Sequence, residues 1–215
     1  MPKLNCGEIG LNYLEQGMGP DVVLAIHGNL GCADWLAPVF PSLPSRLRVI
    51  APDRRGCGAS DKPPVAEGFA NYRMEIHARD HLALLDRLGV ERCHLYGHST
   101  GGIIVSYLLA MAPERFDRVL MLDPVSPWGL QLNDGQIDIL KAMQRSEEIA
   151  FAGMASAAPT LFVENSLRAD QSPRFAENTS LQQREAFMRI VANTMPLSNG
   201  VWFGVPPLLA EGWET

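Results

Sequence analysis

The chain has 215 residues, with 18 Lys and Arg against 24 Asp and Glu, so its formal net charge is −6. A composition of 47% hydrophobic and 20% charged residues is typical of a soluble globular protein and excludes a disordered or fibrous chain. The acidic balance argues against nucleic acid as a partner, because phosphate binding needs a basic face, and the length fits one domain with an insertion.

Short apolar runs alternate with helical patterns through the first half of the chain. The predicted strands are residues 3–6, 11–14, 21–26, 47–51, 92–96 and 118–122, and the predicted helices are residues 74–88 and 101–111. Most of these strands are apolar throughout rather than alternating, which indicates burial on both faces. The alternation predicts an α/β fold with a mostly parallel sheet covered by helices on both faces.

The pattern changes after Asp123. Residues 135–150 and 181–194 have helical spacing, and no clear strand lies between them. We therefore expect a helical insertion on the sheet domain. The expected organisation is a core over residues 1–124, a helical cap over 125–200 and a return segment over 201–215.

Residues 97–101 read Gly-His-Ser-Thr-Gly and match the pattern G-x-S-x-G. They lie between a predicted strand and a predicted helix, which is the context of a nucleophile elbow, with the serine at a sharp turn. Gly97 and Gly101 remove side chains that would collide in that turn, which His98 helps to form. The amide of Thr100 would point to where an oxyanion forms. Ser99 is therefore the candidate nucleophile, and a plain glycine turn is the alternative.

His27, Gly28 and Asn29 end an earlier predicted strand. The backbone N–H of Asn29 could supply the second oxyanion donor, and Gly28 lets the backbone approach closely. His27 itself is expected to be a packed, hydrogen-bonded residue that supports the loop. An ordinary turn after a strand is the alternative for the whole motif.

Residues 53–60, Asp-Arg-Arg-Gly-Cys-Gly-Ala-Ser, follow the next predicted strand. Two glycines suit turn geometry and the charges can pin the loop, so we interpret the segment as structural. An anion site made by Arg54 and Arg55 is the alternative.

These three motifs, HGN at 27–29, DRRGCGAS at 53–60 and GHSTGG at 97–102, resemble those of the α/β-hydrolase superfamily and occur in its order. The similar members are its cap-bearing esterases, lactonases, C–C bond hydrolases and haloalkane dehalogenases. The resemblance covers about residues 9–125 well and the insertion loosely. It implies an acyl-enzyme on Ser99, an oxyanion hole from the amides of Asn29 and Thr100, and a cap that shapes a pocket for a small acyl substrate. Serine at 99 argues against the dehalogenases and epoxide hydrolases, which resemble this chain but carry an aspartate there.

A serine nucleophile needs a histidine within hydrogen-bond reach, oriented by a carboxylate. In this fold the chain order is nucleophile, acid, histidine, but no histidine follows Ser99. Two further strand–helix units would need on the order of 60 residues, against the 15 residues of 201–215. We therefore expect the chain to lack the last two strands of the fold. Asp123 is a candidate acid, with a cap of the turn before Pro124 as its alternative.

The five histidines are residues 27, 77, 81, 94 and 98. His94 lies in the middle of a predicted strand and is expected in the core. His77 and His81 are four residues apart on a predicted helix, and we expect them on a solvent-exposed face, with a metal pair as the alternative.

Three classes of function remain open. The first is a serine hydrolase of ester, lactone or related acyl or C–C bonds, the second a non-catalytic or truncated homologue, and the third a thioesterase or acyltransferase. No metal or organic cofactor is implied, and oligomeric state cannot be read from the pattern. The N-terminus has no secretion signal, and no apolar stretch approaches the roughly 20 residues that span a bilayer. The four cysteines are expected to be free thiols in a cytoplasmic protein.

Overall fold

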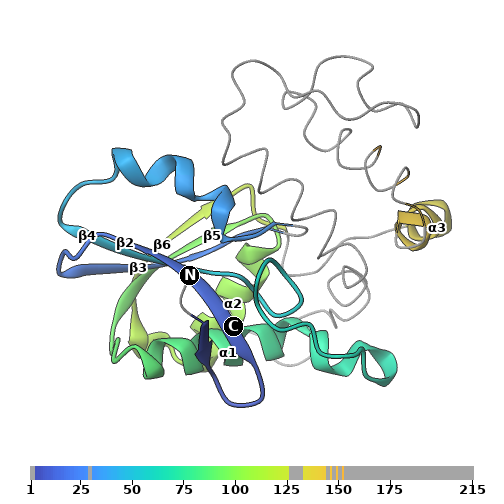
Figure 1. Cartoon of the computed structure of the whole chain (residues 1–215), viewed down its shortest axis with the longest axis horizontal. Helices are drawn as coiled ribbons and strands as arrows, with labels where there is room; N and C mark the ends of the chain where they lie inside the picture. Colours follow the sequence, from blue (N-terminus) through green and yellow to red (C-terminus); the bar gives the residue numbers. More distant parts are fainter. Residues whose placement is uncertain are drawn as a thin grey trace, which may run out of the picture.

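A computed structural model of the chain describes residues 3–28, 31–125, 133–143, 146, 149 and 152 (Figure 1). The strands are β1 (Lys3–Asn5), β2 (Gly10–Gln16), β3 (Asp21–Ile26), β4 (Leu47–Pro52), β5 (Cys93–His98) and β6 (Phe116–Leu122). The longer helices are α1 (Met74–Arg87), α2 (Gly101–Met111) and α3 (Asp134–Met143). Short 3₁₀ helices span Ala33–Trp35, Ala37–Ser42, Glu67–Tyr72 and Pro113–Arg115.

The described strands form a six-stranded sheet in the order β1-β2-β4-β3-β5-β6. β2 pairs antiparallel with β1 and β4, whereas β3 runs parallel to β4 and β5, and β5 runs parallel to β6. Ile26 lies opposite Gly97 and His98 opposite Leu122, so β3, β5 and β6 end at the same edge. The predicted α/β fold with a mostly parallel sheet is confirmed, and the loops that follow these strands are brought together at one edge.

Helices α1 and α2 lie together on one face of the sheet (Figure 1). α2 is almost entirely apolar and buries Ile103, Ile104 and Leu108, while α1 contributes Leu84 and Leu85. Burying one such side chain stabilises the fold by about 1.5–3 kcal/mol. This apolar layer is the main core, and it supports the point where β5 passes into α2.

The opposite face of the sheet carries the short helices of residues 33–42, drawn in blue in Figure 1. Beside them is a largely apolar hollow of about 730 Å³, lined by residues such as Val23, Phe40 and Tyr96. His94 is half-buried in the wall of this hollow, not enclosed in the core as expected. The hollow is lined from the starts and middles of the strands, and Ser99 is not among its lining residues, so we do not assign it to the candidate site.

The prediction that His77 and His81 lie on a solvent-exposed face is wrong. His77 is 1% exposed and His81 is 0% exposed. Both belong to the buried stripe of α1, which also contains Met74, Ala78 and Leu84 at helical spacing. The helical spacing of the two histidines already placed them on this stripe in the sequence. For their burial, this position matters more than the polarity of the rings. In the part of the chain that is described, no cluster of three or more metal-ligating residues occurs.

All four cysteines, Cys6, Cys32, Cys57 and Cys93, are buried thiols outside any disulfide, as predicted. Across the described ranges, every helix is too short or too polar to cross a bilayer. The first part of the helix predicted over residues 135–150 is observed as α3. The helix predicted over residues 181–194 and the segment 201–215 lie outside the described residues.

A buried ion pair fastens the loop of residues 53–60 to α1. Arg55 Nε and Nη2 donate to the two carboxylate oxygens of Asp80 at 2.6 and 2.7 Å, and Nη1 donates to the Asn71 carbonyl at 2.7 Å. Both charged side chains are only 7% exposed. The geometry agrees with the structural interpretation of this motif for Arg55.

Removing the carboxylate of this pair should be costly. Asp80→Ala would leave a buried guanidinium unpaired, and we expect the free energy of unfolding to fall by about 3–5 kcal/mol. The control is Glu75→Ala, which removes an exposed pair with Arg79 and should change stability by less than about 0.5 kcal/mol. Urea denaturation monitored by circular dichroism measures both, and equal effects would contradict the prediction.

The buried histidines should make stability fall in mild acid. Burial lowers the pKa of His81 to about 4 and also lowers the pKa of His77 well below its usual value. The unfolded chain therefore takes up protons below about pH 6.5 that the folded chain does not, which weakens folding by up to about 1.4 kcal/mol per pH unit for each histidine. Urea denaturation at pH 7.5, 6.5 and 5.5 should show a smaller pH slope for His81→Leu than for wild type. An unchanged slope would contradict this assignment.

Candidate active site

Ser99 occupies a strained turn between β5 and α2. Its φ is +52°, and in the described part Asp123 is the one other non-glycine residue with positive φ. This left-handed conformation is unfavourable for residues with a side chain and persists where surrounding structure enforces it. Here the Ser99 N–H donates to the Leu122 carbonyl at 3.0 Å, and the Ser99 carbonyl accepts from Gly102 at 2.9 Å and Val125 at 3.0 Å. The turn is therefore held from α2 and from the end of β6.

The start of α2 lies so close to the end of β3 that the two backbones are in contact. A Cβ atom added to Gly101 would lie 2.4 Å from the Ile26 carbonyl oxygen and 3.0 Å from that of His27. A Cβ atom at Gly97 would lie 2.8 Å from Val105 Cγ2. The two glycines of the G-x-S-x-G pattern therefore allow helix, turn and strand to meet, as the sequence predicts.

The chain leaving β3 passes directly beside Ser99. A Cβ atom added to Gly28 would lie 3.0 Å from Ser99 Cβ and 3.1 Å from His98 Nδ1. The structure thus brings together Gly28, His98 and Ser99, which the sequence placed in two separate motifs. Asn29, the predicted oxyanion donor, lies outside the described residues.

The carbonyl of Gly28 accepts three hydrogen bonds. Its donors are His27 Nδ1 at 2.8 Å, Arg54 Nη2 at 2.9 Å and the Gly31 N–H at 3.3 Å. His27 Nε2 accepts the N–H of Arg54 at 3.1 Å, which places the ring proton on Nδ1. Burial, followed by the charge of Arg54, holds the pKa of His27 well below its usual value. His27 is a neutral, fully hydrogen-bonded support of the loop, as predicted, and both its nitrogens are occupied.

Thr100 directly precedes the first turn of α2 and is buried. The amides at a helix start have no intrahelical acceptor, and the helix dipole adds positive potential there. The backbone N–H of Thr100 is therefore suited to donate a hydrogen bond to a negatively charged oxygen beside Ser99.

His98 and Asp123 lie at the same edge of the sheet as Ser99. His98 is half-buried, and burial lowers its pKa, while the charge of Asp123 opposes that shift. Asp123 is exposed and has a φ of +45°. Over the described ranges, its carboxylate makes no hydrogen bond or ion pair, so neither a bond to a histidine nor a cap of the Pro124 turn is observed. Asp123 therefore lies at the same edge of the sheet as Ser99, but it makes no hydrogen bond with Ser99 or His98.

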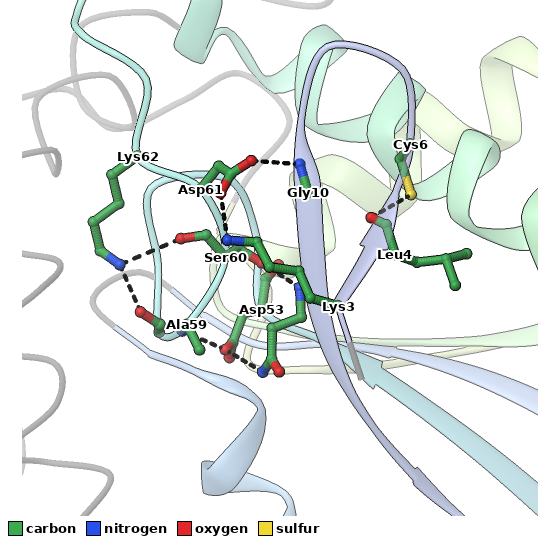
Figure 2. A network of polar contacts seen from close by, with 11 residues as sticks. Lys3, Leu4, Cys6, Gly10, Asp53, Ala59, Ser60, Asp61 and Lys62 are labelled. Atoms are coloured by element: carbon green, nitrogen blue, oxygen red, sulfur yellow. Dashed lines mark hydrogen bonds and ion pairs between the residues drawn. The ribbon is translucent and has the colours of Figure 1, made fainter. Parts of the chain in front are cut away.

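Asp53 is a buried carboxylate that organises the surrounding loops, which agrees with the interpretation of residues 53–60 as a structural segment whose charges pin the loop. Asp53 Oδ1 accepts the N–H of Ala33 at 2.7 Å, and Oδ2 accepts from Asn12 Nδ2 at 2.8 Å and the Ala59 N–H at 2.7 Å. The Ser60 hydroxyl donates to the Asp53 carbonyl at 2.7 Å (Figure 2). An aspartate directly after a buried strand, followed by glycines and a serine, was the available signal. Asp53 thereby connects β2, β4 and the loop that follows Gly28.

Beside Asp53, Asp61 contacts the N-terminal hairpin that β1 and β2 form. Its carboxylate accepts the Gly10 N–H at 2.6 Å and pairs with Lys3 (Figure 2). Lys62 Nζ donates to the carbonyls of Gly58 at 2.6 Å and Ser60 at 3.3 Å. These part-buried contacts lie on the outer side of the 53–60 loop, whereas Asp53 and Arg54 are buried on its inner side.

The chain is similar to known proteins both in sequence and in structure. The family model described as alpha/beta hydrolase fold matches residues 21–208. Fluoroacetate dehalogenase of Burkholderia sp is 37% identical over 99 residues, 46% of this chain and 32% of that protein. The 2-hydroxy-6-oxononadienedioate/2-hydroxy-6-oxononatrienedioate hydrolase of Paraburkholderia xenovorans is 36% identical over 121 residues, 54% of this chain and 40% of that protein.

The crystal structure of the enol-lactonase from Burkholderia xenovorans is also similar. It has a TM-score of 0.71 and 21% identity over 96% of this chain and 75% of that chain. At this identity the likeness supports the fold alone. The match spans less than half the length of each of these two curated relatives.

Gly101→Ala should destabilise the protein through the contact with β3. The added methyl group would meet two backbone carbonyl oxygens, and overpacking of this kind costs about 1–3 kcal/mol. Gly135→Ala on α3 is the matched control, because its Cβ would lie 3.4 Å from its nearest neighbour, Asn133 Oδ1. Thermal unfolding should show a lower midpoint for Gly101→Ala only. A midpoint equal to that of wild type would refute the close approach.

Proposed function

The chain belongs to the α/β-hydrolase fold family, and we propose that it is a serine hydrolase that forms an acyl-enzyme on Ser99. Its substrates would be small molecules with ester, lactone or related acyl bonds, acyl C–C bonds included. The observation that carries the proposal is the strained turn at Ser99, with φ of +52°, between a buried strand and a buried helix. Strain of this kind is typical of functional residues that the surrounding fold over-determines.

The relatives support hydrolysis without selecting the bond. They include a fluoroacetate dehalogenase and a 2-hydroxy-6-oxononadienedioate/2-hydroxy-6-oxononatrienedioate hydrolase. The choice of acyl chemistry comes from the serine, because a hydroxyl nucleophile adds to a carbonyl carbon and forms an ester that water can cleave.

The proposed reaction has two halves. Ser99 Oγ adds to the substrate carbonyl while its proton passes to a general base, and the resulting oxyanion is held by the amides of Asn29 and Thr100. The tetrahedral intermediate then expels the leaving group, which takes up a proton and leaves the acyl group on Ser99. Water repeats the addition, and its collapse releases the acid and restores the hydroxyl. Asp123, at the same edge of the sheet, is our candidate for the acid of the site.

A second candidate function is a non-catalytic homologue that binds a small ligand. The observation in its favour is that the sequence contains no histidine after His98. In addition, among the described residues no histidine is hydrogen-bonded to Ser99. The two candidates differ in whether Ser99 reacts, and one experiment separates them.

Reactivity of Ser99 can be measured on the protein expressed from its complete coding sequence. An alkyl fluorophosphonate should label wild type and Ser106→Ala but not Ser99→Ala. Ser106 is a matched control, because it lies on α2 and donates to the Gly102 carbonyl at 3.0 Å. With short esters, Ser99→Ala should lower kcat/KM by roughly a thousandfold or more.

Two results would overturn the acyl proposal. Folded wild type that takes up no label and cleaves no ester would favour the non-catalytic candidate. Fluoride release from fluoroacetate, without ester or lactone cleavage, would replace acyl transfer with dehalogenation.

A further inference from the structure

We propose that the turn by which the chain leaves β6, residues 122–125, positions the oxyanion donor at Thr100. The backbone N–H of Val125 holds the Ser99 carbonyl and thereby orients the peptide group that carries the Thr100 N–H. In this role Val125 and Asp123 are positioning residues that act through the backbone, separately from the Asp123 carboxylate. The inference rests on the proposed function, because an oxyanion forms beside Thr100 only if Ser99 attacks a carbonyl.

This turn binds both backbone polar groups of Ser99. The Ser99 N–H donates to the Leu122 carbonyl at 3.0 Å, and the Ser99 carbonyl accepts the Val125 N–H at 3.0 Å. The same carbonyl also accepts the Gly102 N–H at 2.9 Å, from the first turn of α2. Leu122 and Val125 therefore hold the candidate nucleophile from the two sides of Asp123.

The hydrogen bonds to the Ser99 carbonyl determine where the next N–H points. A trans peptide is planar, so its N–H points opposite to its carbonyl. Gly102 and Val125 both donate to the carbonyl side of the peptide that joins Ser99 to Thr100. The Thr100 N–H is thereby directed away from these two donors. Loss of the Val125 contact would remove one of the two restraints on this peptide group.

The polar groups of Thr100 on this side are unpaired. The residue is 2% exposed, and within the described ranges neither its N–H nor its Oγ1 has a hydrogen-bond partner. Buried N–H groups without an acceptor are rare in folded proteins, and the start of a helix adds positive potential. A buried, unpaired donor next to the strained Ser99 is suited to bind an oxygen that becomes negatively charged during the reaction.

The return of the chain to Ser99 depends on the conformation of Asp123. Its φ is +45°, a left-handed conformation that is unfavourable for residues with a side chain. The turn is supported from below, since a Cβ atom added to Gly102 would lie 2.5 Å from Pro124 Cβ. Val125 then packs against the main core. The left-handed turn thus places the Val125 N–H at the Ser99 carbonyl.

Two variants that both lack the Asp123 carboxylate test this role in the protein expressed from its complete coding sequence. Asparagine tolerates the left-handed conformation, whereas valine is β-branched and does not. With short esters, we expect kcat of Asp123→Val to be about 10- to 100-fold below that of Asp123→Asn, with KM within about twofold. The reason is that a misplaced donor weakens binding of the transition state and not of the substrate.

The matched control is Asp117, an exposed residue of β6 whose carboxylate pairs with Arg92. Asp117→Asn and Asp117→Val both remove that ion pair, and valine suits a strand. These two variants should therefore have equal kcat.

Amide hydrogen exchange measures the Val125 contact without catalysis. The Val125 N–H should be protected in wild type and in Asp123→Asn, and it should exchange at least about tenfold faster in Asp123→Val. A Val125 amide that is unprotected in wild type would overturn the proposal.

The remaining outcomes separate this inference from the proposed function. If folded wild type neither takes up fluorophosphonate nor cleaves esters, the proposed function fails, whatever the exchange rates are. An active wild type with equal kcat in Asp123→Asn and Asp123→Val overturns the role of the turn alone, as does a difference confined to KM. If neither variant turns over, the same tenfold criterion applies to their rates of fluorophosphonate labelling. If Asp123→Val does not fold, Asp123→Ala is compared with Asp123→Gly, because alanine also disfavours positive φ.

Discussion

The contact between the start of α2 and the end of β3 is the constraint on which the candidate site depends. Because Gly101 has no side chain, the start of the helix can approach the carbonyl oxygens of Ile26 and His27. In the turn between the two elements, Ser99 has a φ of +52°. Hydrogen bonds with Leu122 and Val125 hold the same residue from β6. The serine is thus placed by three adjacent parallel strands, which is more rigid support than a loop alone provides.

Two kinds of support meet at this point. Beneath the turn, α1 and α2 bury an apolar layer against the sheet and stabilise the fold as a whole. On the other side of Gly28, the support is polar and specific. Asp53 accepts three N–H donors from different segments, and Arg54 and His27 donate to a single carbonyl. The apolar layer tolerates substitutions of similar volume, whereas each polar contact depends on one donor and one acceptor.

Local patterns predicted the elements that are apolar along their whole length. β3 and α2 have the expected bounds, residues 21–26 and 101–111. β2 extends to Gln16 and β5 to His98, because pairing with neighbouring strands continues past the apolar run.

The motif at residues 53–60 predicted a loop pinned by its charges, but the partners of Asp53 could not be predicted, since Asn12 and Ala33 are 41 and 20 residues away in sequence. For the same reason no local pattern could assign Arg54 to the Gly28 carbonyl. The burial of His81 was predictable from its helical spacing, but its polarity led to the opposite interpretation. For the candidate site, the sequence motifs indicated Ser99, Gly28 and Gly101, whereas the polar support behind Gly28 became visible only in three dimensions.

The burial of the four cysteines bears on which atoms of this protein react with electrophiles. A thiolate is a far stronger nucleophile than a thiol, and burial raises the pKa of Cys6, Cys57 and Cys93, which keeps them protonated near pH 7. Sulfur, which usually outcompetes oxygen for soft electrophiles, is therefore shielded in all four positions. The same shielding protects these side chains from oxidation, since sulfenic acid formation also begins from an accessible thiolate. Cys6, Cys57 and Cys93 are therefore poor targets for alkylating and oxidising reagents.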